Sequence, residues 1–416
     1  MRSPIPDSVM PSLNQELERF RPSAIAEMFS LASRLKAQGR DIVDLTIGEP
    51  SFKTPEHIKR AAIAAINADV TKYTSSSGNL ELRRAICAKF ERDNGLVFHS
   101  DQILVDSGVK PLLFHAMKAM LADGDEVILP TPCWTSYPGM VVLAGARPVF
   151  VPCSQDAGFK LQAADLERAI TPSTKMLVLN SPSNPTGATY DAAGMRALTD
   201  VLLRHPDVWV MADDIYEHVV CGDFKFATPA QVEPLLYDRT LTLNGVSKAY
   251  SMTGWRIGYA AGPERLIRAI LQVLSQTTGC ACSVSQAAAL AALNGPQTFL
   301  REWAESYEMR RNHLVARLRD VPGLSCNLPE GAFYLFPSCA GLIGKLTPQG
   351  QTIGSSTDFV RFLLQEHGVA VVPGSAFEYD PHFRISYAVS LVELERACER
   401  IERACRALTW ERPSLA

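Results

Sequence analysis

Two kinds of hydrophobic pattern alternate along most of the chain. Short apolar runs, as expected for buried strands, separate longer stretches in which apolar residues recur every three or four positions, as in amphipathic helices. The strand-like runs lie at 103–106, 126–129, 147–152, 174–179, 209–212, 241–243 and 255–260. Strands that alternate with helices at this spacing predict an α/β protein with a mainly parallel, doubly wound sheet.

The pattern changes after residue 297. The segment 297–319 carries Glu and Arg at helical spacing, and it predicts a long helix that links two domains. Short strand-like runs follow at 332–336, 369–372 and 383–387, with helical runs between and after them. This part of the sequence predicts a smaller α+β domain.

Composition narrows the class of protein. The 416 residues, 47% hydrophobic and 20% charged, suit a large globular protein of two or three domains. The 41 basic and 44 acidic residues form no long run of one sign, so nucleic acid and anionic membranes are not expected partners. No signal core or apolar run of ~20 residues is present, and the ten cysteines are scattered. We expect a soluble cytoplasmic protein with reduced thiols and no metal site.

The candidate chemistry centres on Lys248, which lies between the strand-like runs 241–243 and 255–260. A lysine held where charge is costly loses its proton readily, and its neutral amine can form a Schiff base with a carbonyl compound. Ser247 and Arg256 add a hydroxyl and a guanidinium that suit a phosphate. An amine beside a phosphate site suggests pyridoxal 5'-phosphate. A surface lysine beside a structural arginine is the alternative.

Several polar or aromatic side chains follow the expected strands, where ligands bind in doubly wound sheets. These residues are Ser107, Trp134, Asn184, Asp213 and Lys248. A carboxylate such as Asp213 can keep a pyridine nitrogen protonated, and Tyr216 and Asn184 can donate to a ring oxygen. If Asp213 were only a helix cap, Asn184 only a turn residue and Trp134 only a core residue, their convergence would be unexplained.

Three further features suit an anionic ligand. The turn Ser107–Lys110 joins a strand to a predicted helix at 112–121, which is the geometry of an anion site. Gly48 follows the strand-like run 41–47, where it either allows backbone to approach a ligand or forms an ordinary turn at the strand end. Arg384 interrupts an apolar strand, so it is either paired internally or free for a carboxylate.

From about residue 22 to 408 the chain resembles the class I/II pyridoxal-phosphate-dependent aminotransferases of fold type I. The likeness rests on the segments LTIGEP, KYTSSSGNLELR, PCWTSYP, NSPSNPTGA, ADDIYEH, SKAYSMTGWRIGY, PEGAFYLF and FRISYA, which occur in the family's order. It implies a homodimer with shared active sites and three parts of the chain. These are an N-terminal arm (1–22), a small domain (23–54 and 312–416) and a large cofactor-binding domain (55–311) that includes the linking helix.

The resemblance also assigns roles in cofactor binding. It makes Lys248 the Schiff-base lysine and proton shuttle, Asp213 the pyridinium partner, and Tyr216 and Asn184 the contacts to the ring oxygen. Trp134 would stack on the ring, and Tyr73 would reach the phosphate of the neighbouring subunit. The remaining phosphate contacts would be Ser247, Arg256 and the backbone of Gly108, Val109 and Lys110. The chain has Gly108-Val109 where relatives often have two glycines, and Asp214 where many have Glu.

For substrate, the resemblance implies that Arg384 grips the α-carboxylate with Asn184 and the Gly48 backbone, beside Trp134. It also predicts a cis Asn184–Pro185 bond. The likeness is closest to bacterial aspartate aminotransferases. Some of these use a lysine near Lys118 for the distal carboxylate, whereas others use an arginine from the neighbouring subunit, and the stretch 271–282 has no cation. A solvated Lys118 is the alternative, and Ile25 would suit an apolar side chain.

These observations predict ping-pong transamination between aspartate and 2-oxoglutarate. Aromatic or small apolar amino acids are alternative substrates, and elimination by a lyase of the same fold is an alternative reaction. A cofactor-holding regulator without turnover is a third reading, but such proteins carry a fused DNA-binding segment, and the arm here is short and not basic.

Overall fold

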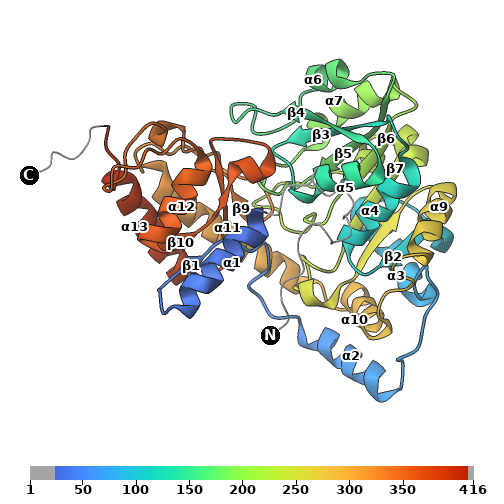
Figure 1. Ribbon diagram of the computed structural model, residues 1–416. Coiled ribbons are helices and arrows are strands. Elements are labelled where there is room, and N and C mark those ends of the chain that lie inside the picture. The colour runs from blue at the N-terminus through green and yellow to red at the C-terminus, as the bar shows by residue number, and fades with distance from the viewer. Residues whose placement is uncertain (1–23, 411–416) are drawn as a thin grey trace, which may run out of the picture.

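The structure, a computed structural model, describes residues 24–410 and shows two lobes (Figure 1). The large lobe is built on one seven-stranded sheet, and the small lobe on two shorter sheets. Helix α11 (Thr298–Arg319) follows the last helix of the large lobe and packs along α13 (Leu391–Ala407) of the small lobe. The predicted N-terminal arm, residues 1–22, lies outside the described residues.

The large sheet has the order β2-β8-β7-β6-β5-β3-β4. β8 (Gly258–Ala261) runs antiparallel to both neighbours, and the other pairs are parallel. The remaining strands are β2 (Ile103–Asp106), β3 (Glu126–Thr131), β4 (Arg147–Pro152), β5 (Thr174–Asn180), β6 (Trp209–Asp213) and β7 (Thr240–Gly245). The predicted mainly parallel sheet is therefore confirmed.

Both faces of this sheet are covered by helices, which explains why its strands are continuously apolar. In β5, Met176 and Val178 pack into one hydrophobic cluster and Leu177 and Leu179 into another. One face packs against α4 (Val109–Met120), α5 (Ser136–Ala144) and α9 (Glu264–Ser275). The other helices of the lobe are α2 (Glu56–Asn67), α3 (Leu80–Asn94), α6 (Ala163–Ala169), α7 (Ala192–Leu203), α8 (Pro229–Val232) and α10 (Ser283–Asn294).

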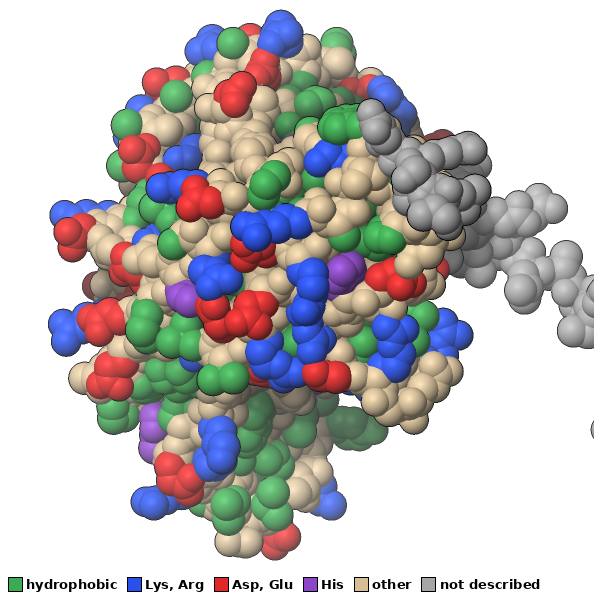
Figure 2. All heavy atoms as spheres, turned by 90° about the vertical axis from the view of Figure 1, so that its left-hand side faces the viewer, with side chains coloured by type: hydrophobic (Ala, Val, Ile, Leu, Met, Phe, Trp, Pro, Cys, Tyr) green, Lys and Arg blue, Asp and Glu red, His purple; other side chains and the backbone are tan. Residues whose placement is uncertain are grey.

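The small lobe joins segments from the two ends of the chain. β1 (Val43–Asp44) pairs in parallel with β10 (Val369–Ala370), and β11 (Val372–Pro373), β12 (Phe383–Ser386) and β9 (Tyr334–Leu335) form an antiparallel sheet. Helices α1 (Ala24–Ala37), α12 (Ser356–His367) and α13 surround these sheets. Figure 2 shows the outer face of this lobe, where basic and acidic side chains are interspersed. The boundaries at 54/55 and 311/312 stay a prediction.

Several expected elements differ from the structure. The runs 41–47 and 332–336 each contain a strand of only two residues, β1 and β9. The helix expected at 112–121 begins at Val109, because Pro111 is compatible with a first helical turn. The run 369–372 divides between two sheets, since β10 and β11 have different partners. The run 255–260 is not one strand: a 3-10 turn spans Thr253–Trp255, and Arg256 has a left-handed backbone with φ of 56° before β8 begins.

Candidate active site

A cavity of about 360 Å³ lies between the two lobes, at the carboxyl ends of the parallel strands. Asp213 ends β6, and Trp134, Asn184 and Lys248 follow β3, β5 and β7. The arrangement of strand ends predicted from the sequence is therefore present. The cavity is lined by most of the predicted site residues, namely Gly48, Val109, Lys110, Trp134, Asn184, Asp213, Tyr216, Ser247, Lys248, Arg256 and Arg384.

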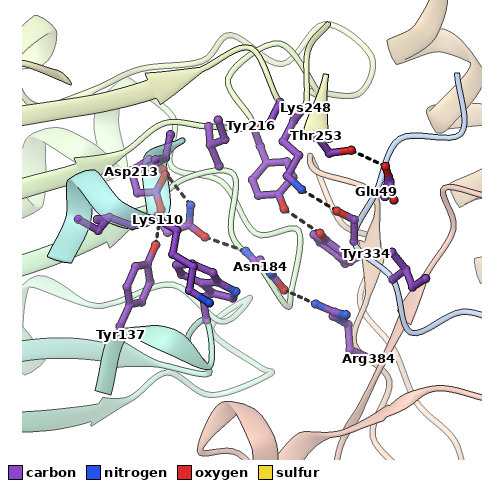
Figure 3. Close-up of a pocket in the computed structure, with 18 of the residues that line it drawn as sticks. Glu49, Lys110, Tyr137, Asn184, Asp213, Tyr216, Lys248, Thr253, Tyr334 and Arg384 are labelled. Atoms are coloured by element: carbon purple, nitrogen blue, oxygen red, sulfur yellow. Dashed lines mark hydrogen bonds between the residues drawn. The ribbon is translucent and has the colours of Figure 1, made fainter. Parts of the chain in front are cut away.

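The amine of Lys248 points into this cavity (Figure 3). Its Nζ donates to the carbonyl oxygen of Gly48 at 2.6 Å. Burial lowers the pKa of Lys248 to about 8, and the positive charge of Arg384 adds to the effect. A substantial fraction of the amine is therefore neutral near pH 8, as a Schiff-base nucleophile requires.

Asp213 is a buried carboxylate with one oxygen unpaired. The hydroxyl of Tyr137 donates to Oδ2 at 2.6 Å, whereas Oδ1 has no hydrogen-bond partner among the described residues. Burial raises the pKa of Asp213 to about 6, although the Tyr137 hydrogen bond opposes this shift. The carboxylate is therefore charged at neutral pH, and its free oxygen suits a protonated nitrogen of a ligand.

The turn between β2 and α4 forms a cradle for an anion. Gly108 has a φ of 107°, and a Cβ at this position would lie 2.4 Å from Nη2 of Arg256. Glycine thus permits both the backbone conformation and the close approach of the guanidinium. Ser247 lines the cavity beside this turn, where α4 begins with unpaired N–H groups. Helix N–H groups, a hydroxyl and a guanidinium together suit a phosphate.

Arg384 on β12 is buried, with 1% of its surface exposed. Nη1 donates to Oδ1 of Asn184 at 2.9 Å, Nη2 donates to the carbonyl of Thr46, and Nε has no partner. No Asp or Glu of residues 24–410 forms a salt bridge with it. A buried guanidinium without an anionic partner is costly, so the site suits a carboxylate ligand. The sequence left Arg384 either paired internally or free for a carboxylate, and the structure favours an arginine that can bind a carboxylate.

Two tyrosines of the site carried no role in the sequence analysis. Tyr137 and Tyr334 both line the cavity, and the Tyr334 hydroxyl lies 2.7 Å from that of Tyr216. Both belong to segments that carry the family likeness, PCWTSYP and PEGAFYLF. An aromatic residue in an apolar run is typical of a core, so the sequence pattern alone did not single them out.

A buried ion pair lies next to this site and was also missed. Glu217 follows Tyr216 directly, and its carboxylate pairs with the ammonium of Lys89 from α3. Asn94 connects to both, accepting from Lys89 at 2.8 Å and donating to Glu217 at 3.0 Å. The positive charge of Lys89 holds the pKa of Glu217 below its usual range despite burial. The segment from Asp213 to Glu217 is thereby fixed to α3.

Four residues singled out in the sequence do not line the cavity. Ser107 and Gly108 lie in the turn before α4, and Tyr73 and Lys118 lie further away. Tyr73 is 98% exposed. Lys118 lies in the last turn of α4 with its side chain exposed. Lys110 does line the cavity, and its Nζ lies 5.3 Å from the centre of the Trp134 ring. Burial and the nearby Arg256 lower the pKa of Lys110. The side chain of Ile25 lies outside the described residues.

The Asn184–Pro185 peptide bond is cis, as predicted.

Comparison with known proteins gives a consistent result over nearly the whole chain. Residues 40–401 match the family described as aminotransferase class I and II. The chain is 56% identical to a probable aspartate/prephenate aminotransferase of Rhizobium leguminosarum bv. phaseoli, over 96% of this chain and 100% of that protein. The crystal structure of the aspartate aminotransferase from Rhizobium meliloti superposes with a TM-score of 0.94 at 52% identity, over 96% of this chain and 100% of that chain. An aspartate aminotransferase from Thermus thermophilus, solved with maleate, gives a TM-score of 0.89 at 40% identity, over 95% and 100%.

Proposed function

Since the chain belongs to the class I and II aminotransferases and is itself an aminotransferase, we propose that its cavity binds pyridoxal 5'-phosphate and exchanges amino groups by a ping-pong mechanism. One observation carries the proposal. A single cavity combines an amine of lowered pKa, a buried carboxylate with a free oxygen, an anion cradle and a buried arginine without an acidic partner. These groups match the aldehyde, ring nitrogen and phosphate of the cofactor and the carboxylate of an amino acid.

When bound, the cofactor supplies an electron sink for the bond broken at the α-carbon of the substrate. Lys248 holds the cofactor through its amine and then moves the α-proton. Asp213 keeps the ring nitrogen protonated, and Tyr137 orients the Asp213 carboxylate. Tyr216 and Asn184 donate to the ring oxygen.

The other residues of the cofactor site bind the ring face and the phosphate. Trp134 provides a flat surface for the ring. The phosphate contacts are Ser247, Arg256 and the backbone of Gly108, Val109 and Lys110. The N–H groups of Val109 and Lys110 begin α4, whereas that of Gly108 already donates to the carbonyl of Asp106 at 2.7 Å. Tyr73 is exposed, which suits a contact with the phosphate site of a second subunit. We therefore propose a homodimer with shared active sites.

The proposed substrates are aspartate and 2-oxoglutarate, because close relatives are named aspartate or aspartate/prephenate aminotransferases. Arg384 binds the α-carboxylate with Asn184 and the Gly48 backbone. We assign the distal carboxylate to the Lys110 side chain rather than to Lys118, because Lys110 lines the cavity and Lys118 does not. Prephenate is a second candidate acceptor, since it also carries two carboxylates.

Product analysis tests the reaction. Aspartate and 2-oxoglutarate mixed with the enzyme and cofactor should give oxaloacetate and glutamate in equal amounts. Ammonia or an unsaturated product in place of glutamate would indicate a lyase instead.

A pair of lysine variants tests the substrate assignment. Lys110→Ala should lower kcat/KM for aspartate by a factor that corresponds to about 1.5 to 3 kcal/mol, the scale of a charged hydrogen bond. The kcat/KM for alanine, which has no distal carboxylate, should stay unchanged. Lys118→Ala is the matched control on the same helix and should leave both substrates unchanged. A loss of aspartate activity in Lys118→Ala but not in Lys110→Ala would show that Lys118 binds the distal carboxylate.

Location and domain organisation complete the proposal. Among residues 24–410, no helix is long and apolar enough to cross a membrane. We place the enzyme in the cytoplasm, where the thiols of its ten free cysteines would remain reduced. We also retain the small domain at 23–54 and 312–416 and the large domain at 55–311.

A further inference from the structure

Tyr334 lies where the two lobes meet in the cavity (Figure 3). The small lobe supplies this residue from β9, whereas Tyr216 follows β6 of the large lobe. The two hydroxyl oxygens are 2.7 Å apart, and the Tyr334 side chain is buried, with 1% exposed. One hydrogen bond thus connects the phenol assigned to the cofactor with the lobe that holds the substrate carboxylate.

The ring of Tyr334 makes a second contact, with Arg384. The guanidinium carbon of Arg384 lies 4.7 Å from the centre of the Tyr334 ring, a cation–π geometry. Arg384 has no acidic partner among the described residues, so an aromatic face is part of what stabilises its charge. Tyr334 therefore contacts both Tyr216, assigned to the cofactor, and Arg384, assigned to the substrate carboxylate.

Gly48 shows how tightly the Tyr334 hydroxyl is placed. A Cβ at residue 48 would lie 2.2 Å from the hydroxyl oxygen of Tyr334. Any side chain at this position would displace the hydroxyl from Tyr216. The glycine therefore serves Tyr334 as well as the carbonyl that accepts from Lys248 at 2.6 Å.

The direction of the hydrogen bond matters for Tyr216. If Tyr216 donated to Tyr334, its proton would not be free for the cofactor. Burial raises the pKa of both phenols, and the positive charge of Arg384 opposes this rise in both. Because the guanidinium stacks on the ring of Tyr334, 4.7 Å from its centre, we take Tyr334 as the donor. With Tyr334 as donor, the proton of Tyr216 is free to point into the cavity.

We propose that Tyr334 is a positioning residue: its hydroxyl donates to Tyr216 and directs the Tyr216 proton toward the ring oxygen of the cofactor, while its ring supports Arg384. This inference rests on the proposed function, because it needs a cofactor in the cavity. It links cofactor tuning and carboxylate binding through one side chain.

The test compares Tyr334→Phe with Tyr387→Phe in the enzyme loaded with pyridoxal 5'-phosphate. Tyr387 is a matched control, since it is buried in the same lobe and donates to the carbonyl of Ala332 at 3.1 Å. The readout is the pH midpoint at which the visible band of the bound cofactor changes. Tyr334→Phe should raise this midpoint by about 0.4 to 1 unit, the scale of one net hydrogen bond. A weaker Tyr216 donor leaves the ring oxygen more negative, so it holds the proton of the neighbouring nitrogen more tightly.

A second arm measures the dissociation constant of succinate, an unreactive dicarboxylate. Tyr334→Phe keeps the ring and should change this constant by less than about twofold, whereas Tyr334→Leu should raise it about twofold to thirtyfold through loss of the cation–π contact. Gly48→Ala provides a second route, because it displaces the Tyr334 hydroxyl without altering Tyr334. It should raise the pH midpoint as Tyr334→Phe does, even if the latter folds poorly. A shift that persists in a Tyr216→Phe background would come instead from the Gly48 carbonyl, which accepts from Lys248.

The outcomes separate the two proposals. A wild-type protein with no visible band in the presence of cofactor would overturn the proposed function itself. A wild-type band whose midpoint stays unchanged in Tyr334→Phe and Gly48→Ala would overturn only the role of Tyr334. The role also fails if Tyr334→Phe shifts the midpoint equally in a Tyr216→Phe background, because the effect would then not pass through Tyr216.

Discussion

The charge on Asp213 should destabilise the empty enzyme, and the size of this effect follows from the structure. The pKa of Asp213 rises from 3.8 to about 6 on folding because the carboxylate is buried. An acid whose folded pKa is raised contributes stability that is fully present below pH 3.8 and is lost as the pH rises through about 6. The loss amounts to about 1.5 kcal/mol at pH 5 and about 3 kcal/mol above pH 7.

The Asp213→Asn variant isolates this cost, because asparagine retains an oxygen that accepts from Tyr137 but does not ionise. Urea unfolding of the cofactor-free proteins is measured from pH 5 to 8 at fixed protein concentration. As the pH rises from 5 to 8, the wild type should lose about 1.5 kcal/mol of unfolding free energy relative to the variant. Asp156→Asn, which removes an exposed carboxylate, serves as the control and should run parallel to the wild type.

With saturating cofactor, the wild type should become more stable than Asp213→Asn. A protonated ring nitrogen pairs with the wild-type carboxylate and offsets its burial, whereas the asparagine gains no ion pair. Parallel pH profiles for wild type and Asp213→Asn without cofactor would show that Asp213 titrates as an ordinary carboxylate. In that case the free oxygen would not be evidence for a cationic ligand.

Three further changes probe the rest of the site. Lys248→Ala should abolish transamination and the visible band while leaving the melting temperature intact, and a near-wild-type rate would refute its assignment. Arg384→Gln should lower kcat/KM for amino and oxo acids alike, by a factor that corresponds to about 2 to 5 kcal/mol of transition-state stabilisation, as loss of a buried charge partner does. Unequal losses for the two kinds of substrate would show that the shared carboxylate binds elsewhere. Lys89→Met should destabilise the fold by up to about 3 to 5 kcal/mol, because the buried Glu217 carboxylate then keeps only His218, at 3.2 Å, as a cationic neighbour. Lys89→Met with Glu217→Leu should recover part of that loss, and equal destabilisation in both variants would argue against the ion pair.

The large lobe could be predicted well from the sequence because its strands, apart from the edge strand β4, are largely buried on both faces and therefore form apolar runs. The polar residues that follow those runs could be predicted to meet, because parallel strands bring their carboxyl ends to one edge of the sheet. The small lobe was harder, because its strands β9, β10 and β11 have two residues each and change partners within one run. Contacts between segments far apart in the chain had no local signal: neither Tyr334 with Tyr216 nor Lys89 with Glu217 follows from spacing along the chain.

The distal carboxylate shows a different limit of sequence reasoning. Lys110 and Lys118 lie on one helix, and both are lysines near the phosphate turn. Lys110 lies in the first turn of α4, at the cavity, whereas Lys118 lies in the last turn, about 12 Å further along the helix axis. Composition cannot separate them, whereas the register of the helix start at Val109 does.

The pairing of β1 with β10 has a consequence for how the polypeptide is made. Val43 lies opposite Val369, so the two strands leave the ribosome about 15 to 65 s apart at ~5 to 20 residues per second. During this interval β2 to β8 are already available to assemble, while Val43 and Leu45, which are buried in the finished protein, have no native partner. A nascent chain that stalls before residue 369 would therefore carry a complete seven-stranded sheet and an exposed N-terminal strand. Such a chain is open to pairing with other copies during translation.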